Sequence, residues 1–283
     1  MENVSLGKQP NQRSSRFHTK YKCYVASVRL LLIAMFNQKS SFLFIYGMPL
    51  LFLFLLGSFY PNEKGLGPIM ATSAVMGITM TSGSLNYMPQ RIVEFRKSSL
   101  LARISLSPLS KLDLIMSIII FNVVINITQV FWVMGMSFAI YSHDWFGSNI
   151  FNASSGYFNI GYFIGAILLY ILFMVSLGAL ISALSKNQSM ANLLGFLFYM
   201  LPAFLSGQFI PAESLGSTMT TISQILPTTY LQRMLTLSFL PANIPHQTLV
   251  DMKINLEWWG YIIPPASTIV IILIAVKSFN WDR

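Results

Sequence analysis

The chain has 283 residues, of which 54% are hydrophobic and only 10% are charged, and its formal net charge is +9. Ordinary soluble domains carry about 25% charged residues, so this composition excludes a soluble protein and predicts one that lies in a bilayer. The single cysteine, Cys23, excludes an intramolecular disulfide and a cysteine-based metal cluster. We expect the basic charge in cytoplasmic loops, and no nucleic-acid partner, because no basic and aromatic surface remains outside the apolar segments.

The polar N-terminal part contains two different segments. Residues 1–18 are basic and are expected to be disordered. In residues 19–40, apolar side chains recur at helical spacing, among them Val25, Val28 and Leu32. This pattern predicts an amphipathic helix in the membrane interface, with its basic residues toward the lipid headgroups.

The apolar segments that follow predict an all-α membrane protein. They are about 20 residues long, enough for a helix to cross the hydrocarbon core, and the short alternating segments of a β-barrel do not occur. Residues 41–283 are expected to form one transmembrane domain of six helices. The predicted spans are about 41–59, 67–87, 112–141, 160–184, 189–206 and 258–276.

Two stretches between the spans carry information. Residues 88–111 form a basic loop, and residues 207–257 are apolar but interrupted by prolines, which predicts short re-entrant helices in the outer leaflet. With a cytoplasmic N-terminus, fifteen of the eighteen Lys and Arg residues lie on the cytoplasmic side, and the other three are Lys64, Arg233 and Lys253. This asymmetry predicts a multi-pass protein of a plasma membrane, in keeping with a bacterial one, with both termini in the cytoplasm.

Neutral polar residues within the spans are candidates for a substrate pathway. The second span contains Thr72, Ser73 and Thr79, and the third carries three amides on one helical face, Asn122, Asn126 and Gln129. Because amides that face lipid are costly, this face must meet protein or water. Two interpretations stay open, a hydrogen-bonding seam between helices and a polar pathway for an amphipathic or hydrophobic substrate.

The sequence lacks the motifs of a catalytic or energy-converting protein. No phosphate-binding G-x-x-x-x-G-K-[ST] loop, no H-E-x-x-H and no G-x-S-x-G occurs, so we expect no catalytic residue and no metal site. The predicted spans contain essentially no ionisable residue, although ion-coupled transporters usually keep one near the bilayer midplane. A transporter of this kind must therefore receive energy from a partner, and the basic loop is the place where such a partner can act.

Two stretches resemble a known family. The first is the run from Arg91 to Ser110, with its charged start, its pair Leu100–Leu101 and its Pro108 before the third span. The second follows the fifth span and comprises Ser206–Pro211 and Ile225–Tyr230. In this order and spacing they resemble the membrane subunits of ABC transporters of the type-2 exporter class, permeases that pair with a separate ATPase chain. Ser98-Ser99 stands where that family usually has Gly-Thr.

The resemblance implies partners and a mechanism. Two permease copies, identical or paralogous, would form the pathway and dock on ABC ATPase subunits, which would hold ATP and Mg, while this chain would bind no cofactor. The second and fifth spans would border the pathway. The coupling helix would comprise Arg91, Glu94, Phe95, Arg96, Leu100, Leu101, Arg103 and Ile104. The outer gate would include Gly207, Pro211, Pro227 and Tyr230.

The function expected from this resemblance is ATP-driven export by alternating access. The cargo would be an amphipathic or hydrophobic drug, lipid or peptide. The alternative is a membrane scaffold or immunity-type protein that binds a partner without pumping.

Overall fold

The computed structural model describes residues 39–59, 67–97, 111–141, 160–211, 214–240 and 246–278, together with five residues of the preceding segment. Every regular element in these ranges is helical and none is a strand, which confirms the prediction of an all-α protein. The segment 1–18 lies outside the described residues. Of the predicted interfacial helix, Val28 and Leu32 pack against the core, whereas Val25, Arg29 and Ile33 are exposed.

Helices occupy each of the six predicted ranges. They are α2 (Lys39–Phe59), α3 (Gly67–Ser82) with the π-helical turn η2 (Gly83–Tyr87), α6 (Lys111–Tyr141), α8 (Ile160–Leu184), α9 (Gln188–Leu205), and the 3₁₀ turn η6 (Trp258–Tyr261) with α13 (Ile263–Ser278). Among the described residues, four segments are long and apolar enough to cross a membrane, namely Ile115–Tyr141, Ile160–Leu184, Gln188–Leu205 and Trp258–Ser278. Ile45–Phe59 is a shorter apolar helix. The chain is therefore a multi-pass membrane protein, and the full set of six spans stays a prediction.

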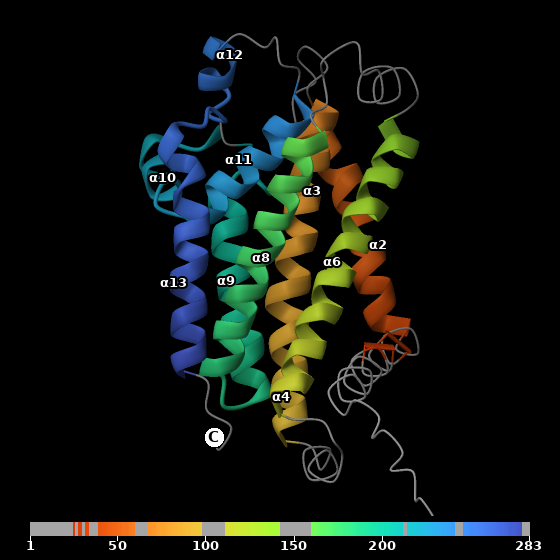
Figure 1. Cartoon of the computed structure of the whole chain (residues 1–283). Helices are drawn as coiled ribbons and strands as arrows, with labels where there is room; N and C mark the ends of the chain where they lie inside the picture. The colour runs from red at the N-terminus through yellow and green to blue at the C-terminus, as the bar shows by residue number, and fades with distance from the viewer. Residues whose placement is uncertain are drawn as a thin grey trace, which may run out of the picture.

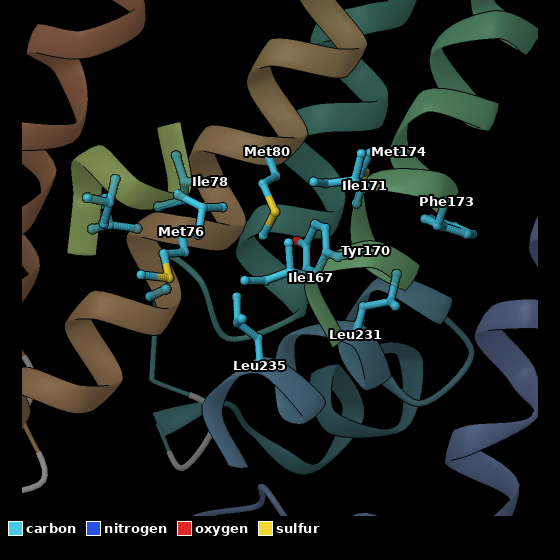
Figure 2. Packing of buried hydrophobic residues seen from close by; sticks show 14 of the residues in the cluster. Met76, Ile78, Met80, Ile167, Tyr170, Ile171, Phe173, Met174, Leu231 and Leu235 are labelled. Carbon is cyan, nitrogen blue, oxygen red and sulfur yellow. The ribbon is translucent and has the colours of Figure 1, made fainter. Parts of the chain in front are cut away.

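The helix α3 lies at the centre of the bundle. Every residue from Ile69 to Thr81 is buried, and α3 packs against α2, α6, α8 and α11. Its many small and hydroxylated residues allow this close approach from several sides. Figure 2 shows Met80 of α3 beside Tyr170 of α8 in the buried cluster, to which α11 contributes Leu231.

A second helix, α4 (Met88–Lys97), continues α3 and η2 without a break. The residues that join them, Ser82 and Met88, both have right-handed helical backbone angles. The sequence predicts a short helix within the loop 88–111, and Met88–Lys97 is helical. This end of the bundle also holds the end of α13, while α10, α11 and α12 lie at the opposite end (Figure 1).

In its described residues, the stretch 207–257 contains the short helices α10 (Ser217–Ser223), α11 (Pro227–Phe239) and α12 (His246–Asp251). Pro227 opens α11, where its fixed φ favours the first helical turn and its missing N–H costs nothing. Eleven of the thirteen residues of α11 are buried, because the helix packs against α3, α8, α9 and α13. α11 is therefore packed into the bundle and is not part of a free loop.

Candidate functional site

A cavity of about 700 Å³ runs between α2 and α9 and is called the α2–α9 groove here. Its floor comes from α3, η2 and α6. Its lining residues are all uncharged: Ile45, Met48, Pro49, Phe52, Ile78, Thr79, Ser82, Gly83, Asn86, Tyr87, Gln90, Gln129, Asn192, Phe196, Tyr199, Met200 and Phe209. Small-molecule sites are typically about 300–1,000 Å³, mostly apolar, with a few placed polar groups. The groove has these properties.

Aromatic side chains form one end of the groove around Phe209. Its ring centroid lies 5.4 Å from that of Phe52, 6.2 Å from that of Tyr199 and 5.1 Å from that of Phe204. Aromatic rings at these separations pack in tilted and edge-to-face arrangements and offer apolar surface of fixed shape. This end suits the apolar part of a ligand.

Two of the six residues predicted for a pathway line the groove. Thr79 donates to the carbonyl oxygen of Met76 at 2.8 Å. Gln129 donates from Nε2 to the carbonyl oxygen of Ile45 at 3.4 Å, and its buried Oε1 has no hydrogen-bond partner. Since buried amide oxygens are nearly always paired, this Oε1 is available to a donor within the groove.

The other two amides of the same helical face form a seam between α6 and η2. Asn122 accepts from Ser84 Oγ at 3.0 Å and donates from Nδ2 to the carbonyl oxygen of Gly83 at 3.1 Å. Asn126 donates from Nδ2 to Asn122 Oδ1 at 2.9 Å and to Ser84 Oγ at 3.1 Å. Both amides are buried and the groove does not reach them. For these two residues the geometry favours the seam.

The two remaining pathway candidates also turn away from the groove. Thr72 is buried and donates to the carbonyl oxygen of Pro68 within its own helix at 2.7 Å. Ser73 Oγ lies 2.9 Å from Thr236 Oγ1 of α11 and lines a second, small cavity at the α11 end. Ser73 therefore belongs to the contact between α3 and α11.

Two glycines hold the π-helical turn η2 from either side. A Cβ on Gly178 of α8 would come well within 3.0 Å of the carbonyl oxygen of Ser84, and a Cβ on Gly195 of α9 would lie 2.5 Å from that of Leu85. Only glycine permits these backbone contacts. Single π-turns within α-helices often mark functional sites, and this one lies where α3 meets α4, beside the groove.

The described part of the predicted coupling region lies on α4. Arg91 Nη1 forms an ion pair with Glu94 Oε2 at 3.0 Å, and the Arg91 guanidinium lies 5.0 Å from the Tyr87 ring centroid. Phe95 also lies on α4, but its side chain is outside the described part of the chain, as are Leu100, Leu101, Arg103 and Ile104. The described part of the predicted coupling region is therefore α4 alone, which is called the stem.

Arg96 points back into the bundle. It donates from Nη1 to the carbonyl oxygen of Ser185 at 3.4 Å and from Nη2 to that of Ser182, both at the C-terminal end of α8. A cation at this position is favoured because the last carbonyls of a helix lack partners. Burial lowers the pKa of the Arg96 guanidinium from its ordinary value, although arginine stays protonated in proteins. Arg96 thus joins α4 to α8.

The four residues predicted for the outer gate lie at the α11 end. Gly207 has a φ of 84°, which only glycine adopts readily, and it turns the chain after α9. Gly207 and Pro211 line the small second cavity, and Pro227 begins α11. Tyr230 is buried, and its ring centroid lies 5.1 Å from that of Trp259 at 76°. The structure brings all four to one end of the bundle.

Several groove residues were missed from the sequence. Asn86, near the end of the second predicted span, and Gln90, just after it, lie four positions apart, and Asn192, Phe196 and Tyr199 recur on α9 at positions i, i+4 and i+7. The spacing on α9 is the signal that could have found the last three. An apolar helix with so few polar side chains gives no sign of which neighbour it faces, so the spacing alone did not single them out.

A family profile described as "ABC-2 family transporter protein" matches residues 59–276, which is more than half of the chain. No curated protein matches the sequence. The matched range runs from the end of α2 to α13 and includes η2, the stem α4 and the α11 end.

Proposed function

Because the chain belongs to the ABC-2 family of transporter proteins, we propose that it is the permease subunit of an ATP-driven exporter of amphipathic or hydrophobic substrates. As a member of this family it is a membrane transport component of an ABC system and is not itself catalytic. ATP and Mg are held by an ABC ATPase on another chain. Both termini and α4 face the cytoplasm, and the α11 end faces outward, in a plasma membrane that fits a bacterial cell.

The observation that carries the proposal is the α2–α9 groove. Its volume of about 700 Å³ fits a small molecule or a lipid segment, and all of its lining side chains are uncharged. A strongly anionic polymer would require Lys or Arg along its path, whereas Thr79, Asn86, Gln129 and Asn192 offer neutral hydrogen bonds among Phe and Met side chains. The lining therefore favours an amphipathic cargo.

A second permease copy completes the pathway in this proposal. The helices that border the groove carry exposed apolar side chains, such as Leu51 and Phe54 on α2 and Leu193 and Leu201 on α9, each 60–65% exposed. Packing of a second copy, identical or paralogous, against these faces would close the groove from the lipid side. The remaining apolar surface, including that of α13, contacts lipid.

The stem α4 provides the route for force. It continues into α3 through η2, and Arg96 joins it to the end of α8. When an ATPase moves the segment after Lys97, the stem moves α3, which forms part of the floor of the groove, together with α8. Since η2 lies against glycines of α8 and α9, a shift of this turn alters the groove and not only the helix that carries it.

The first test asks whether the chain works with an ATPase. The protein is purified from its host in mild detergent, and we expect an ABC ATPase chain to co-purify and to hydrolyse ATP faster when amphipathic compounds are added. If no ATPase chain co-purifies and no ATP is hydrolysed, the protein is a non-pumping scaffold or immunity-type protein.

The second test asks which face meets another permease chain. Because Cys23 is the only cysteine, Cys23→Ser provides a background without thiols. On it, Leu201→Cys on α9 is expected to crosslink to a second permease chain in membranes. Leu273→Cys on α13 is the matched control, since the two leucines are 61% and 65% exposed. Equal crosslinking at both positions would argue against the proposed interface.

A further inference from the structure

A buried arginine at the α11 end has no acidic partner among the described residues. Arg233 of α11 is only 8% exposed, and it donates from Nη1 to the carbonyl oxygen of Asn255 at 3.1 Å. Its Cζ lies 5.9 Å from the Tyr230 ring centroid, and its Nε has no hydrogen-bond partner. The ion pair that the described residues do form, between Arg91 and Glu94, lies on α4 at the opposite end of the bundle and does not involve Arg233.

Arg233 lines the small cavity, whose volume is about 30 Å³. The other lining residues are Met70, Ser73, Ser206, Gly207, Pro211, Gln232, Thr236, Met252 and Ile254. Ser206 Oγ is buried and also has no hydrogen-bond partner. Two unpaired donors, one of them charged, therefore belong to the walls of the same cavity.

The physics of this arrangement favours an anion. A buried charge is costly unless it is paired, and neutral carbonyl and aromatic contacts compensate a guanidinium only in part. Water occupies about 10–15 Å³ by this measure, so 30 Å³ admits one halide ion or one carboxylate head. A 180° rotation of the Gln232 amide, whose Oε1 is unpaired, would add a third donor.

We propose that this cavity binds a small monovalent anion, held by Arg233 Nε–H and Ser206 Oγ–H between α3, α9 and α11. The ligand is either a free halide or the carboxylate group of a larger molecule. The anion neutralises Arg233 and thereby stabilises the packing of α11 on α3, where Ser73 meets Thr236. The site does not depend on the proposed transport function, because binding requires neither an ATPase nor a substrate.

The test measures thermal unfolding of the purified full chain by tryptophan fluorescence. Chloride or acetate replaces isethionate, whose sulfonate is larger than a chloride ion or a carboxylate, at constant ionic strength. We expect a saturable rise of the melting temperature with chloride, with acetate or with both. In Arg233→Gln this rise is lost, and in Ser206→Ala the anion affinity falls about tenfold, as expected for one lost hydrogen bond to a charged ligand.

Lys186→Gln is the matched control because it removes one exposed positive charge at the opposite end of the bundle. It should respond to anions as the unaltered protein does. A response to chloride alone identifies a free halide, and a response to acetate alone identifies a carboxylate group. If Arg233→Gln does not fold, Ser206→Ala decides. The proposal is overturned if neither anion stabilises the unaltered protein saturably, or if Ser206→Ala or a folded Arg233→Gln responds as strongly.

Discussion

Gly178 of α8 contacts η2 closely, and Gly165 on the same helix provides the control for a substitution at this contact. In Gly178→Ala, the new methyl group would overlap the carbonyl oxygen of Ser84 and lie 3.3 Å from Met88 Sδ. The methionine side chain can move, but the carbonyl belongs to the backbone of a buried turn. In Gly165→Ala, also on α8, the methyl group would meet nothing within 4 Å.

The expected magnitude follows from comparing the two variants. Exchange of Gly for Ala in a helix interior stabilises by about 0.8–1.0 kcal/mol, and this gain applies to both positions. Overpacking costs about 1–3 kcal/mol and applies to position 178 alone. We therefore expect Gly178→Ala to be less stable than Gly165→Ala by about 1–3 kcal/mol, or about 5- to 150-fold in the unfolding equilibrium.

The assay is reversible unfolding in mixed micelles with increasing SDS, followed by the fluorescence of the five tryptophans. The difference in free energy of unfolding between the two variants is the measured quantity, so effects of detergent on helix propensity cancel. Equal free energies for the two variants would refute the close backbone contact between α8 and η2.

Four further predictions follow from the seam, the groove and the stem. Asn122→Ala removes the acceptor of the Ser84 hydroxyl and one donor to the Gly83 carbonyl, so the free energy of unfolding should fall by about 1–3 kcal/mol, and an unchanged value would contradict the seam. Ser82→Trp should fill the groove and abolish transport into inverted vesicles, whereas the same change at the exposed Ser58 should not. Arg96→Ala should lower transport per ATP hydrolysed severalfold while the ATPase still co-purifies; normal transport would show that the contact with α8 is dispensable. Leu101→Asp should uncouple transport without preventing membrane insertion, and normal transport with normal ATPase binding would exclude Leu101 from coupling.

Some features follow from composition and local pattern alone. The scarcity of charge and the apolar runs predict an all-α membrane protein because each backbone group in lipid must be paired within its own helix. The resemblance around Arg91–Ser110 and Ser206–Tyr230 predicts the family, which the match over residues 59–276 confirms. These signals are local along the chain, so no knowledge of packing is needed to find them.

Other features depend on which helices become neighbours. The spacing of Asn122, Asn126 and Gln129 predicted that all three lie on one polar face. Packing against η2 gives them different surroundings, because Asn122 and Asn126 form a seam with η2 whereas Gln129 lines the groove. Arg96 looked like any other cation of a basic helix until the end of α8, almost ninety residues further along, supplied its acceptors.

Arg233 shows most clearly which features the sequence alone does not predict. In the sequence it is one of three positive charges assigned to the outside, and nothing near it in the chain indicates burial. The structure buries it because α11 packs against four other helices, which also bring Ser206 and Ser73 to the same cavity. The sequence by itself determined which segments prefer lipid, since that preference is a property of each segment. Only the tertiary structure decided which polar groups are paired, because pairing depends on atoms from distant parts of the chain.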